Sequence, residues 1–219
     1  MKTLRLIADV HSKQKEHLKV IGGSEYSISL GDVGFDYSYL DKVDSDKHKF
    51  FCGNHDNYDS KQNYPHWLGD YGVFELNSIK GFFIGGAFSI DWQYRTKSEL
   101  RTGEKTFWTN EQLSIPELRK AVDLYKEVKP DFMLSHTCPT EIAKKIGNPD
   151  ILRDFGYDPD TFTTNTQEAL QECFEYHRPN LWVFGHMHLN INTIIKKTRF
   201  ICRKELGYTD INENLEVIK

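Results

Sequence analysis

Short apolar runs alternate with helix-like segments along the first quarter of the chain. Residues 4–8, 26–30 and 49–52 have the composition of buried strands, while residues 12–20 and 35–42 are spaced as helices, the first of them capped by Ser12. Strands separated by helices usually pair in parallel, because the helix carries the chain back to the starting edge of the sheet. The pattern therefore predicts a β-α-β-α-β unit with a parallel sheet.

The remaining pattern predicts further strands and helices and two long irregular segments. Residues 73–76 and 82–86 form a strand pair joined by a turn, and helices are expected at 109–128, where Pro116 marks a break or a new first turn, at 140–146 and at 166–177. Strands are expected at 132–135, 181–184, 191–196, 198–203 and 215–218, the last three of antiparallel type. Residues 87–109 and 147–165 show no regular period, and long segments of this kind are often functional. We expect one α/β domain over residues 1–219, with two sheets or one large mixed sheet.

Composition narrows the class of protein. The 28 Lys and Arg stand against 32 Asp and Glu, and this net charge of -4 argues against a surface that binds nucleic acid over its whole extent. No apolar run approaches the roughly 20 residues that a bilayer requires, so we expect no membrane partner. Four cysteines are scattered singly without a Cys-x-x-Cys pair, which predicts reduced thiols and a cytoplasmic location.

Candidate chemistry follows the predicted strands, at the point where each of five strands ends. The carboxyl ends of parallel strands meet at one edge of a sheet, so these side chains are expected to converge there. They comprise imidazoles, carboxylates and one amide without any thiolate, a set that suits Mn, Fe, Zn or Ni. The candidate metal ligands are Asp9, His11, Asp32, Asn54, His136, His186 and His188.

Seven candidate ligands exceed the needs of one ion. If Asp32 bridges with its two carboxylate oxygens, two ions can lie about 3.5 to 4 Å apart, as in two-metal phosphatases and nucleases. A water between two such ions loses its proton near neutral pH, and the ions neutralise charge on phosphate oxygens. The predicted reaction is hydrolysis of a phosphate ester by this metal-bridging hydroxide.

The ordered motifs resemble the signature of the calcineurin-like metallophosphoesterase superfamily over residues 9–188. They are Asp9-Val10-His11, Gly31-Asp32, Gly53-Asn54-His55-Asp56, Ser135-His136 and Gly185-His186-Met187-His188. The resemblance implies a four-layer αββα sandwich of two mixed sheets, with the metal site at the C-terminal strand ends. It also implies one ion on Asp9, His11, Asp32 and His188, and a second on Asp32, Asn54, His136 and His186. His55 would meet the phosphate and the leaving-group oxygen as a catalytic residue, and Asp56 would orient its ring.

Departures from the motifs bear on the substrate. Protein phosphatases of this superfamily carry Asp-Arg-Gly shortly after Gly-Asp, whereas this chain continues from Asp32 as Val33-Gly34-Phe35-Asp36, so phosphoprotein is disfavoured. In the segment 87–109, Arg95 could clamp phosphate while Trp92 or Tyr94 stacks a base, as a nucleotide or a nucleic-acid end would require. The alternative is a surface loop in which the guanidinium pairs with Asp91. Asn54 and Arg95 are the candidate substrate contacts.

The sequence thus favours a dinuclear metal-dependent phosphoesterase, with Mn as the favoured ion, acting on a small phosphomonoester, a phosphodiester or a nucleotide. A lid formed by residues 147–165 would restrict the site to small monoesters, whereas an open groove lined by Arg95 and Lys97 would admit a diester. The alternative from another class is a catalytically silent module that keeps the site as a metal or phosphate receptor and recruits a partner.

Overall fold

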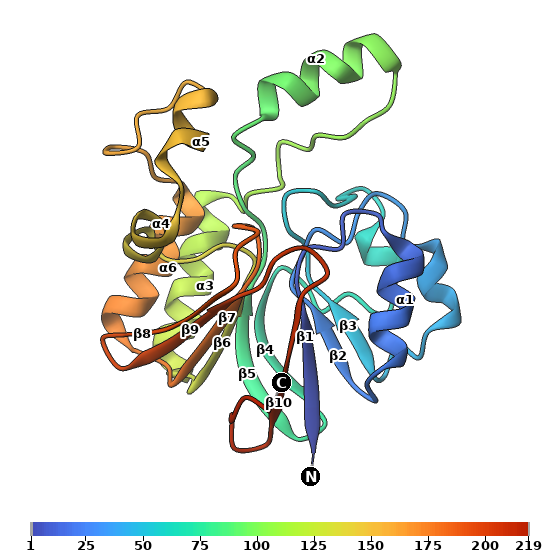
Figure 1. Cartoon of the computed structure of the whole chain (residues 1–219), viewed down its shortest axis with the longest axis vertical. Helices are drawn as coiled ribbons and strands as arrows, with labels where there is room; N and C mark the ends of the chain where they lie inside the picture. The colour runs from blue at the N-terminus through green and yellow to red at the C-terminus, as the bar shows by residue number, and fades with distance from the viewer. Residues whose placement is uncertain (1, 219) are drawn as a thin grey trace.

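The computed structural model describes residues 2–218 and arranges them as two mixed β-sheets packed face to face (Figure 1). The four-stranded sheet has the order β10-β1-β2-β3, in which β1, β2 and β3 are parallel and β10 is antiparallel to β1. Its strands are β1 (Thr3–Ile7), β2 (Ser27–Ser29), β3 (His48–Phe50) and β10 (Tyr208–Asn212). The predicted parallel pairing of the first three strands is therefore confirmed, with an α-helix between β1 and β2 and only a 3₁₀ turn between β2 and β3.

The second sheet has six strands in the order β4-β5-β6-β7-β9-β8. Its four central strands are parallel, and the edge strands β4 and β8 are antiparallel to their neighbours. The strands are β4 (Tyr71–Leu76), β5 (Ile79–Ile84), β6 (Phe132–Ser135), β7 (Leu181–Phe184), β8 (Ile191–Ile195) and β9 (Thr198–Cys202). The expected strand pair before the first long segment is the β4-β5 hairpin.

Alternation along the strands decides which side chains lie between the sheets. Leu181 and Val183 of β7 join the core between the two sheets, whereas Trp182 and Phe184 face the helices that cover the outer side of the six-stranded sheet. Those helices are α3 (Ile115–Val128), α4 (Thr140–Ile146) and α6 (Asn165–Tyr176), while α1 (Gln14–Gly22) covers the four-stranded sheet (Figure 1). The four layers confirm the expected αββα sandwich.

Several element boundaries differ from the predictions. The first helix begins at Gln14 and its N-cap is Lys13, whose side chain makes no capping hydrogen bond. Ser12, the expected cap, lies one residue before this position with a φ of 60°. Residues 35–42 contain only a 3₁₀ turn, η1 (Ser38–Lys42), and a second such turn is η2 (Lys61–Asn63). Helix α3 begins at Ile115 rather than at 109, because Ser114 and Glu117 form a capping box and Pro116 lies in the first turn.

Both segments expected to be irregular contain a helix. Residues 87–109 hold α2 (Trp92–Thr102), and residues 147–165 hold α5 (Pro149–Asp154), which Asn148 caps. The last strand is β10 at Tyr208–Asn212, and the predicted strand at 215–218 is limited to one isolated bridge between Val217 and Ile211. Among residues 2–218, none of the helices combines the length and the apolar character needed to cross a membrane.

The C-terminal ends of β1, β2, β3, β6 and β7 point toward the same end of the sandwich. Helices α2 and α5 project beyond this end from either side, as the upper part of Figure 1 shows. Side chains that follow these five strands therefore lie at the base of a recess between the two projections.

Candidate metal centre and active site

The backbone turns sharply at the candidate ligands. Five of them have φ values in the left-handed region, where residues other than glycine are uncommon. Such conformations cost on the order of 1–3 kcal/mol each and collect at functional sites. The five are Asp9 (φ 44°), His11 (47°), Asp32 (51°), His186 (63°) and His188 (51°).

The first cluster joins the two sheets. One ligand atom from each of Asp9, His11, Asp32 and His188 lies within 4.8 Å of all the others. The Nε2 atoms of His11 and His188 are 2.9 Å apart, and the same atom of His11 is 3.5 Å from Oδ2 of Asp32. The structure thus brings together the four residues that the resemblance implied for one ion.

The second cluster uses the other oxygen of Asp32. Ligand atoms of Asp32, His136 and His186 lie within 4.8 Å of one another. The Nε2 atom of His136 is 3.2 Å from Oδ1 of Asp32 and 3.1 Å from Oδ1 of Asn54. The two carboxylate oxygens of Asp32 therefore face different clusters, which is the geometry that a bridging ligand requires.

Hydrogen bonds behind the ligands fix their orientation. The backbone carbonyl of Leu30 lies 2.7 Å from Nδ1 of His136, so the Nε2 atom is left to face the cluster. The Nδ2 group of Asn54 donates to Ser89 Oγ at 2.9 Å, which directs the amide oxygen inward. The backbone N–H of His186 donates to Asp9 Oδ1 at 2.8 Å. These supporting contacts preorganise the candidate ligands.

Burial and mutual charge shift the pKa values of these groups. Burial raises the pKa of Asp9 to about 7. Burial acts to raise the pKa of Asp32 as well, but the charge and hydrogen bond of His136 outweigh it and hold that pKa well below its usual range. For His136, burial acts to lower the pKa, and the carboxylates of Asp32 and Asp9 raise it to about 9. Burial lowers the pKa of His186 to about 3.

Three observations fit this site to divalent cations. The Oδ2 atom of Asp9 is buried and has no hydrogen-bond partner within residues 2–218, and such a group is costly unless something compensates its charge. A Cβ at Gly53 would lie 2.3 Å from Oδ1 of Asp32 and 2.5 Å from Nε2 of His136, so only glycine lets the backbone approach this closely. The donors are oxygens and imidazole nitrogens, which suit hard to borderline ions.

The structure corrects the role expected for Asp56. Its buried carboxylate accepts hydrogen bonds from the backbone N–H groups of Gly34 at 3.0 Å and Gly53 at 2.6 Å, and from the hydroxyl of Tyr37 at 3.2 Å. These bonds tie the loop after β2 to the loop after β3, and none of the hydrogen bonds of Asp56 reaches the ring of His55. Asp56 therefore holds the backbone of the site and does not orient His55.

His55 itself lies at the site. Its ring centroid is 5.1 Å from that of His11, and its backbone N–H donates to Asp32 Oδ1 at 2.7 Å. Burial lowers the pKa of His55 to about 4, against the opposing charge of Asp32. The ring is therefore neutral at pH 7 in this structure.

The structure also corrects the role expected for Arg95. Only 5% of this residue is exposed, and its Nη1 group donates to Ser89 Oγ at 2.5 Å, to the Asn54 carbonyl at 3.1 Å and to Glu111 Oε2 at 3.3 Å. Its Nη2 group donates to the carbonyl of Thr106. Arg95 thus anchors α2 behind Asn54, and its carboxylate partner is Glu111 rather than the Asp91 of the alternative interpretation.

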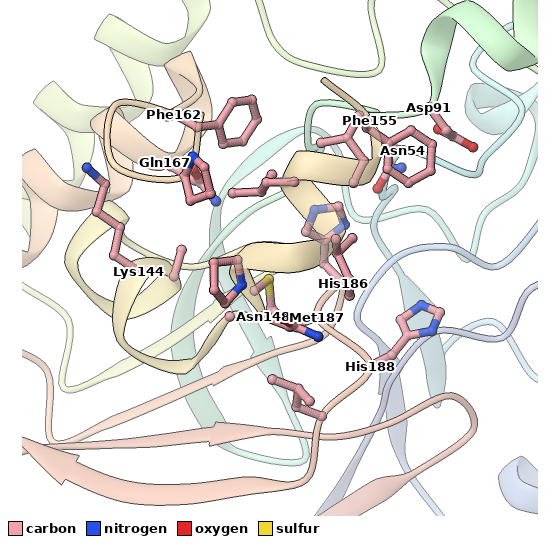
Figure 2. A pocket seen from close by; sticks show the side chains of 18 of the residues that line it. Asn54, Asp91, Lys144, Asn148, Phe155, Phe162, Gln167, His186, Met187 and His188 are labelled. Carbon is pink, nitrogen blue, oxygen red and sulfur yellow. The ribbon is translucent and has the colours of Figure 1, made fainter. Parts of the chain in front are cut away.

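A cavity of about 630 Å³ opens beside the two clusters (Figure 2). None of the residues 92–102 of helix α2 lines the wall of the cavity. The prediction that Trp92 or Tyr94 stacks a base, and that Lys97 lines an open groove, therefore has no support in this cavity. Another part of the wall comes from residues 147–162, in the segment for which a lid was one of two alternatives. Its lining side chains include Asn148, Ile151, Leu152, Phe155 and Phe162.

Sequence reasoning missed the supporting residues of the site. Ser89 and Glu111 act through bonds to Asn54 and Arg95. Ile151 lies on a helix that the sequence pattern did not indicate, and Phe155 is the C-cap of that helix. The signals that point to α5 are Asn148 and Pro149, which match an N-cap followed by the first helical position.

Comparison with known proteins bears on the fold. No protein-family model and no curated protein matches the chain by sequence. A provisionally named 5′-nucleotidase of Staphylococcus aureus, solved in complex with alpha-ketoglutarate, aligns with 98% of this chain and 52% of its own at 13% identity and a TM-score of 0.53. The chain thus spans about half the length of that protein and shares its fold.

Two further solved structures align over most of both chains. An archaeal phosphodiesterase covers 98% of this chain and 96% of its own at 12% identity and a TM-score of 0.44. The phosphoesterase Yfce from E. coli covers 99% and 97% at 12% identity and a TM-score of 0.42. Proteins described as phosphoesterases are therefore among the structures that this chain matches.

Proposed function

We propose that this chain is a dinuclear metal-dependent phosphoesterase of the calcineurin-like metallophosphoesterase superfamily. One observation carries the proposal: Asp32 directs one carboxylate oxygen toward His11 and the other toward His136, within two separate groups of candidate ligands. A carboxylate shared in this way is the feature that distinguishes a two-metal site from two unrelated polar clusters.

The residues present would hold the two ions as the motifs imply. Asp9, His11, Asp32 and His188 form one site, and Asp32, Asn54, His136 and His186 form the other. When bound, two divalent cations supply Lewis acidity that lowers the pKa of water and neutralises charge on a phosphate. Mn²⁺ is the ion that we favour, and Fe, Zn and Ni accept the same mixture of oxygen and imidazole donors.

His55 is the residue that we assign to the leaving group. Its side chain lines the cavity beside His11, where it can donate an N–H hydrogen bond to a phosphate or ester oxygen. A dianionic phosphate beside the ring would raise the pKa of His55 from its low value in the unliganded protein. Substrate binding would thereby favour the protonated ring, which can pass a proton to the departing oxygen.

The shape of the site favours a small phosphate ester. Residues between 147 and 162 line the cavity together with His55 and so narrow the access for a protein loop or a nucleic-acid strand. The cavity is not lined by Arg95, Trp92 or Tyr94. The phosphate clamp and the base stacking that would favour a nucleotide therefore have no residues in this cavity. The substrate that we propose is therefore a small ester rather than a phosphoprotein or a polynucleotide.

Hydrolysis of two chromogenic esters tests the proposal. We expect purified protein loaded with Mn²⁺ to cleave p-nitrophenyl phosphate or bis(p-nitrophenyl) phosphate, and to lose the activity on treatment with a chelator. Asp32→Asn should reduce turnover to background, while Asp123→Asn, an exposed substitution on α3, should leave it unchanged. Absence of metal-dependent turnover on both esters, or wild-type turnover by Asp32→Asn, would contradict the proposal.

A further inference from the structure

The cavity is larger than a phosphate group and two ions require. Its volume of about 630 Å³ falls within the range of about 300–1,000 Å³ that is typical of pockets for drug-sized ligands. His11, Asp32, Asn54 and His55 line it at one side, so the remainder is continuous with the place where the phosphate would bind. That remainder is available to the alcohol portion of an ester.

Part of the wall of the cavity is apolar. Ile151 of α5 and Phe155, the C-cap of that helix, are 49% and 46% exposed, although both residues border the cavity. Phe162 continues the wall and is held by Tyr157 and Phe88, whose ring centroids lie 4.7 Å and 6.3 Å from its own. Large apolar side chains grouped in this way mark a surface that a ligand covers.

Charged groups on this wall are already engaged. The Nζ group of Lys144 donates to the carbonyl of Asp160 at 2.7 Å, and Arg153 pairs with Asp150 at 2.6 Å. Lys144 keeps its positive charge, because a carbonyl is neutral, but Asp150 and Asp160 in the same segment balance the charges of Lys144 and Arg153. This wall therefore has no net positive charge to attract a second phosphate, and the alcohol portion is expected to be uncharged.

Gln167 is one of the polar side chains that line the cavity beside the apolar residues. Gln167 in the first turn of α6 is 8% exposed and lines the cavity, and its side-chain amide makes no hydrogen bond within residues 2–218. The backbone N–H of Gln167 donates a hydrogen bond to the side-chain oxygen of Thr164, the N-cap residue of α6. Figure 2 shows Gln167 and Lys144 on the side of the cavity away from Asn54 and His188. The amide lines the cavity without a protein partner, so a ligand group in the cavity can complete its hydrogen bonding.

Building on the proposed function, we propose that the substrate is a phosphate ester of an uncharged apolar alcohol that carries one hydrogen-bonding group, such as a carbonyl, which Gln167 binds. Hydrolysis breaks the P–O bond to this alcohol and forms a new P–O bond from water. The alcohol oxygen takes a proton, and water is the only co-substrate. The apolar wall on α5 selects the alcohol, while the residues at the strand ends select the phosphate.

Ethyl phosphate and n-hexyl phosphate provide the first test, because their leaving alcohols have nearly equal acidity. Each buried methylene contributes about fourfold, which corresponds to about 0.8 kcal/mol. We expect kcat/KM for the hexyl ester to exceed that for the ethyl ester by at least about tenfold, since four additional methylenes enter the apolar region. Equal values for the two esters would overturn the inference and leave the proposed function intact.

Substitutions on the wall localise the effect. Ile151→Ser and Phe155→Ser should each lower the hexyl-to-ethyl ratio by about fivefold or more, as expected for loss of a buried apolar contact. Ile115→Ser is the matched control, because Ile115 is 62% exposed in the first turn of α3 and does not border the cavity. A ratio that changes equally in all three variants would exclude the wall on α5.

Gln167→Met tests the polar contact with a side chain of similar length. Across alkyl phosphates of four to eight carbons, each with and without a terminal carbonyl, the wild-type protein should prefer the carbonyl form at one chain length. The substitution should reduce this preference by about three- to tenfold, the value of one hydrogen bond. A preference that is absent in the wild-type protein, or unchanged in the variant, would remove Gln167 from substrate recognition.

A binding measurement separates failure of this inference from failure of the proposed function. Calorimetric titration with ethylphosphonate and hexylphosphonate, which carry no hydrolysable P–O–C bond, reports on the apolar wall without any turnover. Tighter binding of hexylphosphonate to a protein that hydrolyses neither ester would support the pocket and contradict the enzyme. Equal affinities of the two phosphonates, together with normal turnover of the esters, would contradict the apolar pocket and support the enzyme.

Discussion

The buried ion pair between Arg95 and Glu111 gives the sharpest prediction about the architecture around the site. Their side chains are 5% and 4% exposed, and Arg95 also donates to Ser89 and to the Asn54 carbonyl. Arg95→Met leaves the carboxylate of Glu111 buried without its charged partner. Breaking a buried pair by removing one member costs about 3–5 kcal/mol.

The cost depends on pH in a defined direction. Burial raises the pKa of Glu111 from 4.5 to about 7, against the opposing effect of Arg95. The pKa of Glu111 is higher in the folded protein than in the unfolded chain, so protonation of this carboxyl stabilises the fold. This stability is fully present below the unfolded pKa and is lost as the pH rises through the folded pKa. Without Arg95 the folded pKa rises further, so the loss on ionisation becomes larger. The substitution should therefore destabilise the protein more at pH 8 than at pH 5.

Urea unfolding at pH 5 and pH 8 measures both quantities. We expect Arg95→Met to lower the free energy of unfolding by about 3–5 kcal/mol at pH 8 and by distinctly less at pH 5. Arg101→Met, an exposed change near the end of the same helix, should remain within about 0.5 kcal/mol of wild type. Adding Glu111→Gln to Arg95→Met should restore most of the loss at pH 8. A penalty no larger than that of Arg101→Met, or one independent of pH, would refute the reasoning.

Three further predictions concern residues around and behind the ligands. Gly53→Ala places a methyl group against two candidate ligands and should weaken Mn²⁺ binding measured by calorimetry, while Gly22→Ala, which has open space, should not. Asp56→Asn should lower the free energy of unfolding by about 1–3 kcal/mol, because a backbone donor loses its acceptor; a loss of turnover at unchanged stability would instead support a role for Asp56 in orienting His55. Burial lowers the pKa of His17 to about 3, so the stability it contributes is present above pH 6.5 and is lost as pH falls toward 3. His17→Gln should flatten the dependence of the melting temperature on pH in that window, and an unchanged slope would contradict this assignment.

Sequence patterns predicted the convergence of ligands because strand ends carry local signals. Each of the five strands is a short apolar run that stops at a ligand-type side chain, and parallel pairing places these stops at one edge. The bridging role of Asp32 and the αββα layers were implied by the resemblance of the ordered motifs to the superfamily signature, since the pattern alone left two sheets or one large mixed sheet open.

The elements that escaped prediction have weak local signals. The sequence of β10, Tyr-Thr-Asp-Ile-Asn, lacks an apolar run, and the strand forms because β1 pairs with it antiparallel over five residues. Helix α2 buries only Arg95 among its residues, so it has no apolar stripe to reveal it.

The roles of Asp56 and Arg95 escaped for a different reason. Both side chains are ligand-like in type and lie near ligands in sequence, which favoured a direct role in chemistry. Their partners, Tyr37 at 19 residues and Glu111 at 16 residues along the chain, are set by tertiary packing. Charge and proximity alone do not separate a group that faces substrate from one that anchors the loop behind it.

Anomalous diffraction from crystals grown with Mn²⁺ tests the central claim most directly. We expect two peaks about 3.5–4 Å apart with the Asp32 carboxylate between them. One peak should lie among Asp9, His11 and His188, and the other among Asn54, His136 and His186. A single peak, or peaks away from Asp32, would contradict a dinuclear centre at these strand ends.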